Sequence, residues 1–97
     1  MNVGISIAEK VFAKDVDDVL KAIGDLLKTK NRKYGDSALN PKRIFSKANA
    51  VEQIKVRLDD KLSRMASQQS DEDEDVITDL MGYLVLLRIA QNRLKKV

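Results

Sequence analysis

Residues 76–87, with the sequence VITDLMGYLVLL, decide the fold of this chain. They are apolar at nearly every position, and they follow directly on the polar and acidic run SDEDED at residues 70–75. Such a run suits the first turn of a helix, where side-chain oxygens cap free N–H groups and carboxylates face the positive end of the helix dipole. The sequence therefore predicts a helix over about residues 71–95, capped by Ser70 and apolar on most of its sides.

Two amphipathic helices are predicted upstream of this segment. In residues 15–30 apolar side chains recur at helical spacing, and Asp15 stands at the position of a cap. A second helix over about residues 46–66 begins at Ser46 or Asn49 and carries a nearly heptad apolar seam. The residues of that seam are Val51, Ile54, Leu58, Leu62 and Met65. We expect the helices at 46–66 and 71–95 to form an antiparallel hairpin.

The remaining segments are less regular. Residues 3–7 could form a short strand or an arm, and residues 8–13 could form a helical turn. Residues 31–45 read as a connection, with turn signals at residues 34–37 and at Asn40-Pro41. This connection is long for a link between packed helices, and long ordered loops are more often functional.

The composition indicates one all-α domain spanning residues 1–97. Apolar residues make up 43% of the chain but aromatic residues only 4%, so the core must consist of Leu, Ile and Val. Three helices of this size leave much apolar surface exposed. We therefore expect the helical bundle to be completed by a second subunit, in a dimer or a higher homo-oligomer.

Several function classes are excluded or disfavoured by composition. The chain has no cysteine and no histidine, which excludes disulfides, thiolate or imidazole metal sites, and catalysis by either residue. A bound metal would need oxygen ligands, which favours Mg²⁺ or Mn²⁺. The net charge of +3 is mild and interspersed, so binding to nucleic acid or membranes is not indicated. With no signal peptide and no long apolar run, the sequence predicts a cytoplasmic protein.

Asp79 is the most informative candidate for a functional residue. On a helix Glu72, Asp75 and Asp79 share one face, because they are three and four residues apart. Burying Asp79 without a partner would cost several kcal/mol. One interpretation is that Glu72 or Asp75, together with Asp79, holds a divalent cation. The alternative is a structural ion pair between Asp79 and Arg57 or Arg64 of the preceding helix.

Further carboxylates lie on the helix predicted at 46–66. With Leu58 facing the core, Glu52 and Asp59 share one flank of that helix, and both are candidate metal ligands. For Glu52 there is an alternative, since the sequence from Asn49 to Glu52 fits a capping box. Asp59 could equally belong to an exposed set of salt bridges of small value. The opposite flank carries Arg57, Asp60, Lys61 and Arg64, and there a structural role is expected for Asp60.

Basic residues gather around the connection between the first two helices. Lys30 and Lys33 are the best candidates to neutralise phosphate groups, and Tyr34 is a candidate to stack on a base. The alternative is a solvated basic loop. Tyr83 follows Asp79 by one helical turn, and we expect its ring to lie in the core.

Four segments taken together resemble a known family. They are residues 30–37 (KNRKYGDS), 41–46 (PKRIFS), 56–64 (VRLDDKLSR) and 75–84 (DVITDLMGYL). In this order they resemble the small phage and bacterial proteins identified as nucleotide modification associated domain 1, over about residues 15–92. That family is similar to the MazG-like all-α nucleoside triphosphate pyrophosphohydrolases. The resemblance implies an oligomeric helical bundle in the host cytoplasm, with Mg²⁺ held by carboxylates of two helices and water attacking a nucleotide phosphate.

The chain departs from the MazG-like signature in one respect. That signature pairs a Glu-x-x-Glu on one helix with a Glu-x-x-Asp on the next. The second pair could map to Glu72 with Asp75 or to Asp75 with Asp79, whereas no Glu-x-x-Glu accompanies Glu52 and Asp59.

Three functions follow as expectations. The first is a Mg²⁺-dependent (d)NTP pyrophosphohydrolase in which Asp59, Asp75 and Asp79 are catalytic, with Glu52 and Glu72 as further metal ligands. Lys30, Lys33 and Tyr34 would bind the nucleotide. The second is an oligomer that binds a nucleotide or signalling nucleotide without hydrolysing it. The third is a structural helical interaction module.

Overall fold

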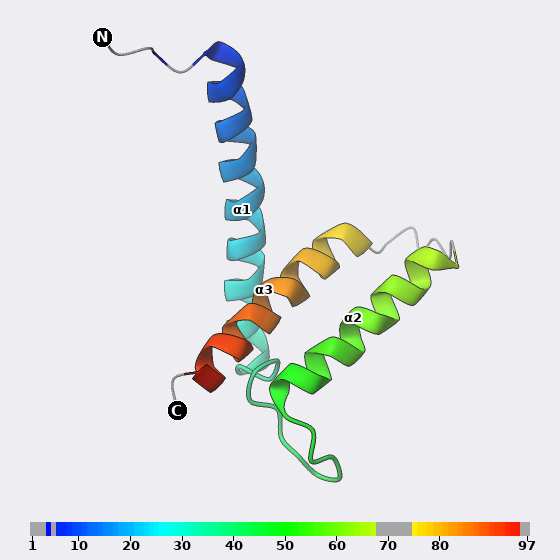
Figure 1. Ribbon diagram of the computed structural model, residues 1–97. Helices are drawn as coiled ribbons and strands as arrows, with labels where there is room; N and C mark the ends of the chain where they lie inside the picture. The colour runs from blue at the N-terminus through cyan, green and yellow to red at the C-terminus, as the bar shows by residue number, and fades with distance from the viewer. Residues whose placement is uncertain (1–3, 5, 68–74, 96–97) are drawn as a thin grey trace.

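The computed structural model describes Gly4, residues 6–67 and residues 75–95. Within these ranges the chain is all-helical, with α1 at Ile7–Tyr34, α2 at Ala50–Ala66 and α3 at Val76–Lys95. Helices α2 and α3 lie side by side as a hairpin, and α1 crosses α3 near the lower end of α1 (Figure 1). The expected all-α hairpin with an additional N-terminal helix is confirmed. None of the described helices combines the length and the apolar composition that crossing a membrane requires.

Helix α1 is longer at both ends than the sequence analysis predicted. Its N-cap is Ser6, whose hydroxyl accepts a hydrogen bond of 3.1 Å from the Glu9 N–H group. The expected cap, Asp15, therefore lies inside the helix. The prediction of a strand or arm at residues 3–7 is wrong at Ile7, which is the first residue of α1. The helix ends at Tyr34 because Gly35 adopts a left-handed conformation with φ of 64°, which glycine tolerates without strain.

Helices α2 and α3 both begin at side-chain caps. Asn49 accepts a hydrogen bond of 2.9 Å from the Glu52 N–H group, so Asn49 is the cap rather than Ser46. Asp75 caps α3 by accepting a hydrogen bond of 3.0 Å from the Thr78 N–H group. The predicted start of this helix at residue 71 was too early, because Asp75 is not helical. The expected cap, Ser70, lies outside the described residues.

The core lies between α2 and α3. It consists of Val51, Ile54 and Leu58 from α2 and Ala90 from α3, all buried. Partly buried side chains from all three of α2, α3 and the connection pack around this cluster; they are Leu39, Ala50, Leu80, Tyr83, Leu86 and Leu87. The predicted seam of α2 is therefore buried in its first three members. Its last two, Leu62 and Met65, are 53% and 48% exposed, because the core does not extend to the end of α2.

Helix α1 is attached to the hairpin at one end only. Ile23 is the buried residue of α1, whereas Val16, Val19 and Leu20 are exposed although they share its apolar face. The N-terminal half of α1 projects away from the other two helices (Figure 1). The fold thus places the C-terminal half of α1 and the following turn beside α3, and this junction is where the candidate site lies.

Candidate functional site

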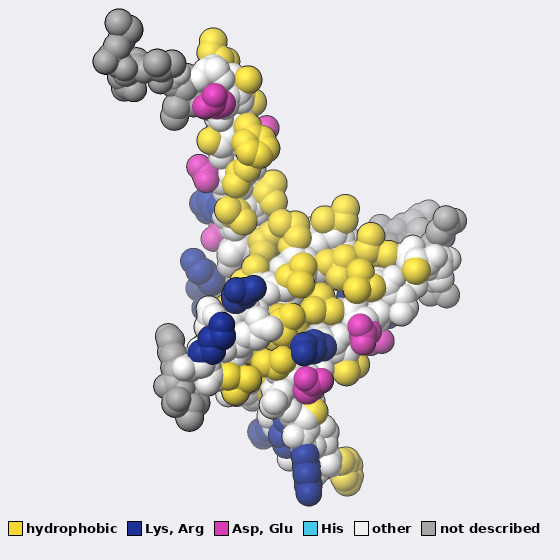
Figure 2. Space-filling model, viewed as in Figure 1, with side chains coloured by type: hydrophobic (Ala, Val, Ile, Leu, Met, Phe, Trp, Pro, Cys, Tyr) yellow, Lys and Arg dark blue, Asp and Glu magenta, His cyan; other side chains and the backbone are white. Residues whose placement is uncertain are grey.

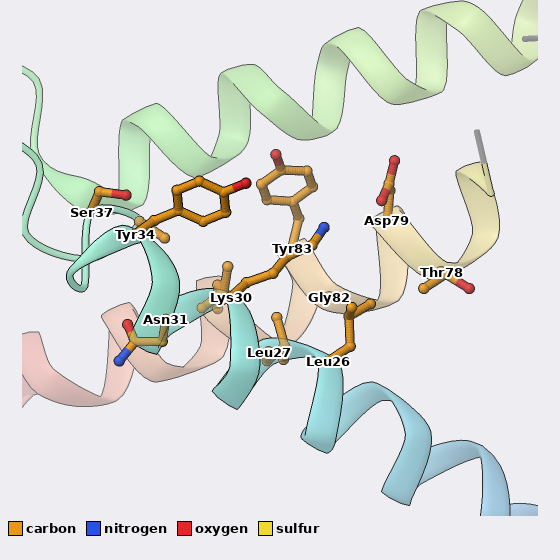
Figure 3. Close-up of a pocket in the computed structure, with 12 residues that line it drawn as sticks. Leu26, Leu27, Lys30, Asn31, Tyr34, Ser37, Thr78, Asp79, Gly82 and Tyr83 are labelled. Atoms are coloured by element: carbon orange, nitrogen blue, oxygen red, sulfur yellow. The ribbon is translucent and has the colours of Figure 1, made fainter. Parts of the chain in front are cut away.

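A cleft of about 300 Å³ lies between the C-terminal half of α1, the turn that follows it and the first half of α3. This volume is at the lower end of the range of small-molecule sites in proteins, about 300–1,000 Å³. Figure 3 shows the side chains that converge on it. The lining residues are Leu26, Leu27, Lys30, Asn31, Tyr34, Ser37, Ala38, Thr78, Asp79, Gly82, Tyr83 and Leu86.

The apolar wall of the cleft depends on a close approach between α1 and α3. A Cβ atom placed on Gly82 would lie 3.4 Å from Cδ2 of Leu27, so the two helices meet with no room for a large side chain at that position. Leu26 and Leu86 extend the same wall. Glycine at this crossing allows α1 to pack close to α3, beside the cleft.

Both tyrosines of the chain line the cleft. Tyr34 ends α1 and Tyr83 lies in the middle of α3, and their rings approach each other across the cleft (Figure 3). The ammonium group of Lys33 lies over the Tyr34 ring, 5.3 Å from its centroid, within the range of a cation–π contact. The cleft therefore presents two aromatic surfaces. Tyr83 fulfils the expectation of a core residue only in part, since it packs against the core and also lines the cleft.

Lys30 supplies a positive charge to the cleft. It lies one turn before Tyr34 on α1, and its side chain extends toward Tyr83 and Asp79 (Figure 3). Within the described parts of the chain, its ammonium group forms no ion pair. Lys33, the second predicted phosphate ligand, is not among the lining residues and instead lies over Tyr34.

Asp79 lies at the edge of the same cleft and contacts α2. Its Oδ2 atom is 3.2 Å from Nζ of Lys61, and the two side chains are only 25% and 14% exposed. The sequence analysis left open whether Asp79 serves a site or a structural ion pair, and the structure shows an ion pair together with a position at the cleft. It does form an ion pair with the preceding helix, and the partner is Lys61, on the flank of α2 shared with Arg57 and Arg64.

The Asp75 carboxylate is occupied by the start of α3. Its Oδ1 atom accepts a hydrogen bond of 3.0 Å from the Thr78 N–H group, and its Oδ2 atom accepts one from the Thr78 hydroxyl group. The hydrogen bonds from Thr78, first that of the side chain and then that of the backbone, hold the pKa of Asp75 below its ordinary value. Asp75 is exposed and does not line the cleft.

The other carboxylates predicted as metal ligands are not brought to the cleft. Glu52 and Asp59 are exposed on α2, where Glu52 lies 3.6 Å from the ammonium group of Lys55. Glu72 lies outside the described residues. Among the residues that the structure describes, no three acidic side chains gather into a group that could hold a metal ion. Of the described candidates for metal binding, Asp79 is the one that faces the cleft.

Sequence reasoning did not single out several lining residues. Thr78, Ser37 and Asn31 carry polar groups that reach the cleft, yet their types and spacing form no recognisable motif. Gly82 carried a signal that was not used, because a glycine within an apolar helix indicates close packing against another element.

Comparison of the chain with protein-family models, curated proteins and solved structures finds no significant match to any of them. The resemblance to nucleotide modification associated domain 1 proteins therefore stays a prediction, and the function is argued from the cleft itself.

Proposed function

We propose that this protein binds a nucleotide in the cleft between α1 and α3. The observation that carries the proposal is the convergence of Lys30, Tyr34, Tyr83 and Asp79 from two helices on one cavity of about 300 Å³. The combination provides aromatic faces, a cation and a hydrogen-bond acceptor within one cleft. A small-molecule site generally has this composition, an apolar wall with few polar groups placed on it.

The charges of the cleft favour an anionic ligand. Lys61 offsets the negative charge of Asp79, so the ammonium group of Lys30 is left to interact with a bound anion. A phosphate group would form a charge-assisted hydrogen bond with Lys30, and such bonds are about twice as strong as neutral ones. The base would stack on the tyrosine rings, and Asp79 would accept a hydrogen bond from an amino or hydroxyl group of the ligand.

Hydrolysis of a (d)NTP is the second candidate function, favoured by the position of Asp79 at the cleft. For that reaction Mg²⁺ or Mn²⁺ would be expected between carboxylates of two helices. The described residues do not fit such a metal, since Asp75 is bonded to Thr78 and both Glu52 and Asp59 lie away from the cleft. We therefore rank binding above catalysis. The third expectation, an interaction module, is supported only by the Lys61–Asp79 ion pair and the exposed apolar surface.

The proposal is tested by thermal melting of the protein with a panel of nucleotides, with and without Mg²⁺, followed by chromatography of each mixture. A ligand at about 100 times its Kd should raise the free energy of unfolding by about 2.7 kcal/mol. A shift with the ligand recovered intact is the expected result. A Mg²⁺-dependent shift with a monophosphate product would establish the hydrolase instead, and no shift with any nucleotide would contradict both.

We also propose that the chain acts as a homo-oligomer, because the apolar face of α1 continues well beyond its contact with α3. The cytoplasmic location and the phage origin that the resemblance implies stay predictions.

A further inference from the structure

The N-terminal half of α1 carries an apolar face that no described part of the chain covers. Phe12, Val16 and Val19 are 69%, 37% and 49% exposed, and the adjacent Leu20 is 60% exposed. In proteins most helical stability comes from the packing of an amphipathic face, so packing contacts along this face would stabilise α1. Its exposed side chains are suited to provide them.

The spacing along α1 is that of a coiled-coil seam. Phe12, Val16, Val19, Ile23 and Leu26 follow one another at alternating steps of four and three residues, a repeat of 3.5. We call these five residues the α1 seam. Ile23 is only 7% exposed because α3 covers the seam there. At Ile23 the α1 seam packs against α3. Toward the N-terminus, from Val19 back to Phe12, the seam continues for about two turns with no described helix against it.

Helix α3 has a second uncovered apolar face. On one face of α3, Leu80 and Leu87 pack against the core with α2. On another face, Gly82 lies against Leu27 of α1. The remaining side carries Ile77, Met81, Leu84 and Val85 at helical spacing, and three of these are exposed by 40% or more: Ile77, Leu84 and Val85. Figure 2 shows hydrophobic side chains running along α1 and on across α3 as one surface.

The charges of α1 indicate what covers this surface. Residues 7–20 carry four acidic and two basic side chains, whereas residues 21–34 carry five basic and one acidic. An identical helix laid antiparallel would place each acidic half along a basic half. The two helix dipoles would also be opposed, which is the favourable orientation. A parallel copy would instead place like-charged halves together.

We propose that a second copy of this chain covers the surface, with the two α1 helices antiparallel and the exposed N-terminal half of each packed along the C-terminal half of α1 and the open face of α3 of the other. This gives the proposed homo-oligomer a surface and an orientation. The seam runs on from Leu26 to Lys30, both of which line the cleft. In this arrangement the partner's α1 would lie beside the mouth of the cleft.

The first test is the oligomeric state of the full chain by analytical ultracentrifugation. We expect a dimer, and we expect Phe12→Asp to weaken it by about 100-fold or more through lost burial of the ring and a charge placed in the interface. Phe45→Asp is the matched control, since Phe45 is 97% exposed in the connection and should leave the dimer intact. Circular dichroism of Phe12→Asp checks that the helices persist.

The second test is the orientation of the two helices, and the absence of cysteine in the chain makes it direct. Ala8 and Lys33 lie at equal distances from the centre of α1 and, at about 3.6 residues per turn, on nearly the same side of it. On mild oxidation, a mixture of Ala8→Cys and Lys33→Cys chains should give the mixed disulfide, while Ala8→Cys alone should give little.

A monomer at all concentrations would overturn the proposal and leave the surface to a different partner. A disulfide that forms readily between two Ala8→Cys chains would overturn the antiparallel arrangement. Neither readout uses a nucleotide, so a failure of self-association is distinguishable from a failure of nucleotide binding.

Discussion

The ammonium group of Lys61 on α2 lies 3.2 Å from the carboxylate of Asp79 on α3. This ion pair joins the two helices of the hairpin on the side where the cleft opens. Both side chains are largely shielded from water, so the Asp79 carboxylate would be costly to keep at this position without the Lys61 ammonium group. The same carboxylate lines the cleft. The pair therefore links the stability of the hairpin to the charge of the site.

A double-mutant cycle measures this coupling. We expect Lys61→Met and Asp79→Asn each to lower the free energy of unfolding by about 1–2 kcal/mol, and the double variant to lose less than the sum. Urea denaturation provides the measurement. The exposed pair of Lys55 and Glu52, 52% and 62% exposed, is the matched control and should show coupling near zero. Additive losses at Lys61 and Asp79 would contradict the structural role of the pair.

Binding of an anionic ligand should depend on Lys30 and not on its neighbour along the helix. Replacing a charged hydrogen-bond donor typically costs about 1.5–3 kcal/mol, so Lys30→Gln should raise the Kd for a nucleotide about tenfold or more. Lys28→Gln removes the same charge from α1 at a residue that does not line the cleft, and it should change the Kd far less. Calorimetric titration measures the Kd of both variants. An equal rise in Kd for Lys30→Gln and Lys28→Gln would mean that Lys30 acts only through long-range charge.

The cap of α3 should make part of the stability depend on pH. The pKa of Asp75 is held below its ordinary value by the hydrogen bonds from Thr78, so the charged form is favoured in the folded state. Its contribution is therefore present above the unfolded-state pKa, about 3.9, and is lost as the pH falls through the lower folded-state pKa.

The variant Asp75→Asn isolates this contribution. Asparagine keeps an oxygen that can accept the Thr78 N–H hydrogen bond, but it does not titrate. At neutral pH we expect the variant to melt a few degrees below the parent, and the difference to shrink as the pH falls through the carboxyl range. A difference that stays constant on acidification would show that the Asp75 charge does not stabilise the helix.

Gly82 should control both the helix crossing and the size of the cleft. Because a Cβ atom there would already lie 3.4 Å from the Leu27 side chain, Gly82→Ala should be tolerated, whereas Gly82→Leu should push α1 away and fill the cleft. We expect Gly82→Leu to abolish nucleotide binding. Gly24→Ala is the control: it meets no described atom within 4 Å and should stabilise α1 by up to about 1 kcal/mol. Unchanged binding by Gly82→Leu would place the ligand elsewhere.

Much of the fold could be predicted from the sequence, and the errors have physical causes. The periodicity of the apolar residues was enough to predict three helices and the α2–α3 hairpin. The start of α1 was missed although Ser6 and Glu9 have the spacing of a capping box, because the polar and small residues of 8–15 obscured the periodicity. The start of α3 was placed too early because every residue of the acidic run is a plausible cap, and the structure uses Asp75.

The site was predictable only in part. Lys30, Tyr34 and Asp79 were expected to act together, and the structure brings all three to one cleft. Asp59 and Glu52 were grouped with Asp79 because helical periodicity predicts which residues share a face of one helix. Whether that face of α2 lies near α3 depends on how α2 is rotated about its own axis in the hairpin. That rotation is set by Leu58 and Ala90 in the core, and helical periodicity does not determine it.

Fluorine NMR of protein labelled with fluorotyrosine tests the central claim most directly. The chain has two tyrosines, both of which line the cleft, so both signals report on that site, although Tyr83 also packs against the core. We predict that adding a nucleotide shifts both signals in the parent protein, and that Lys30→Gln weakens the response. Protein labelled with fluorophenylalanine provides the control, since the signal of Phe45 in the connection should not move. If both tyrosine signals stay in place while the nucleotide is bound, the cleft between α1 and α3 is not the binding site.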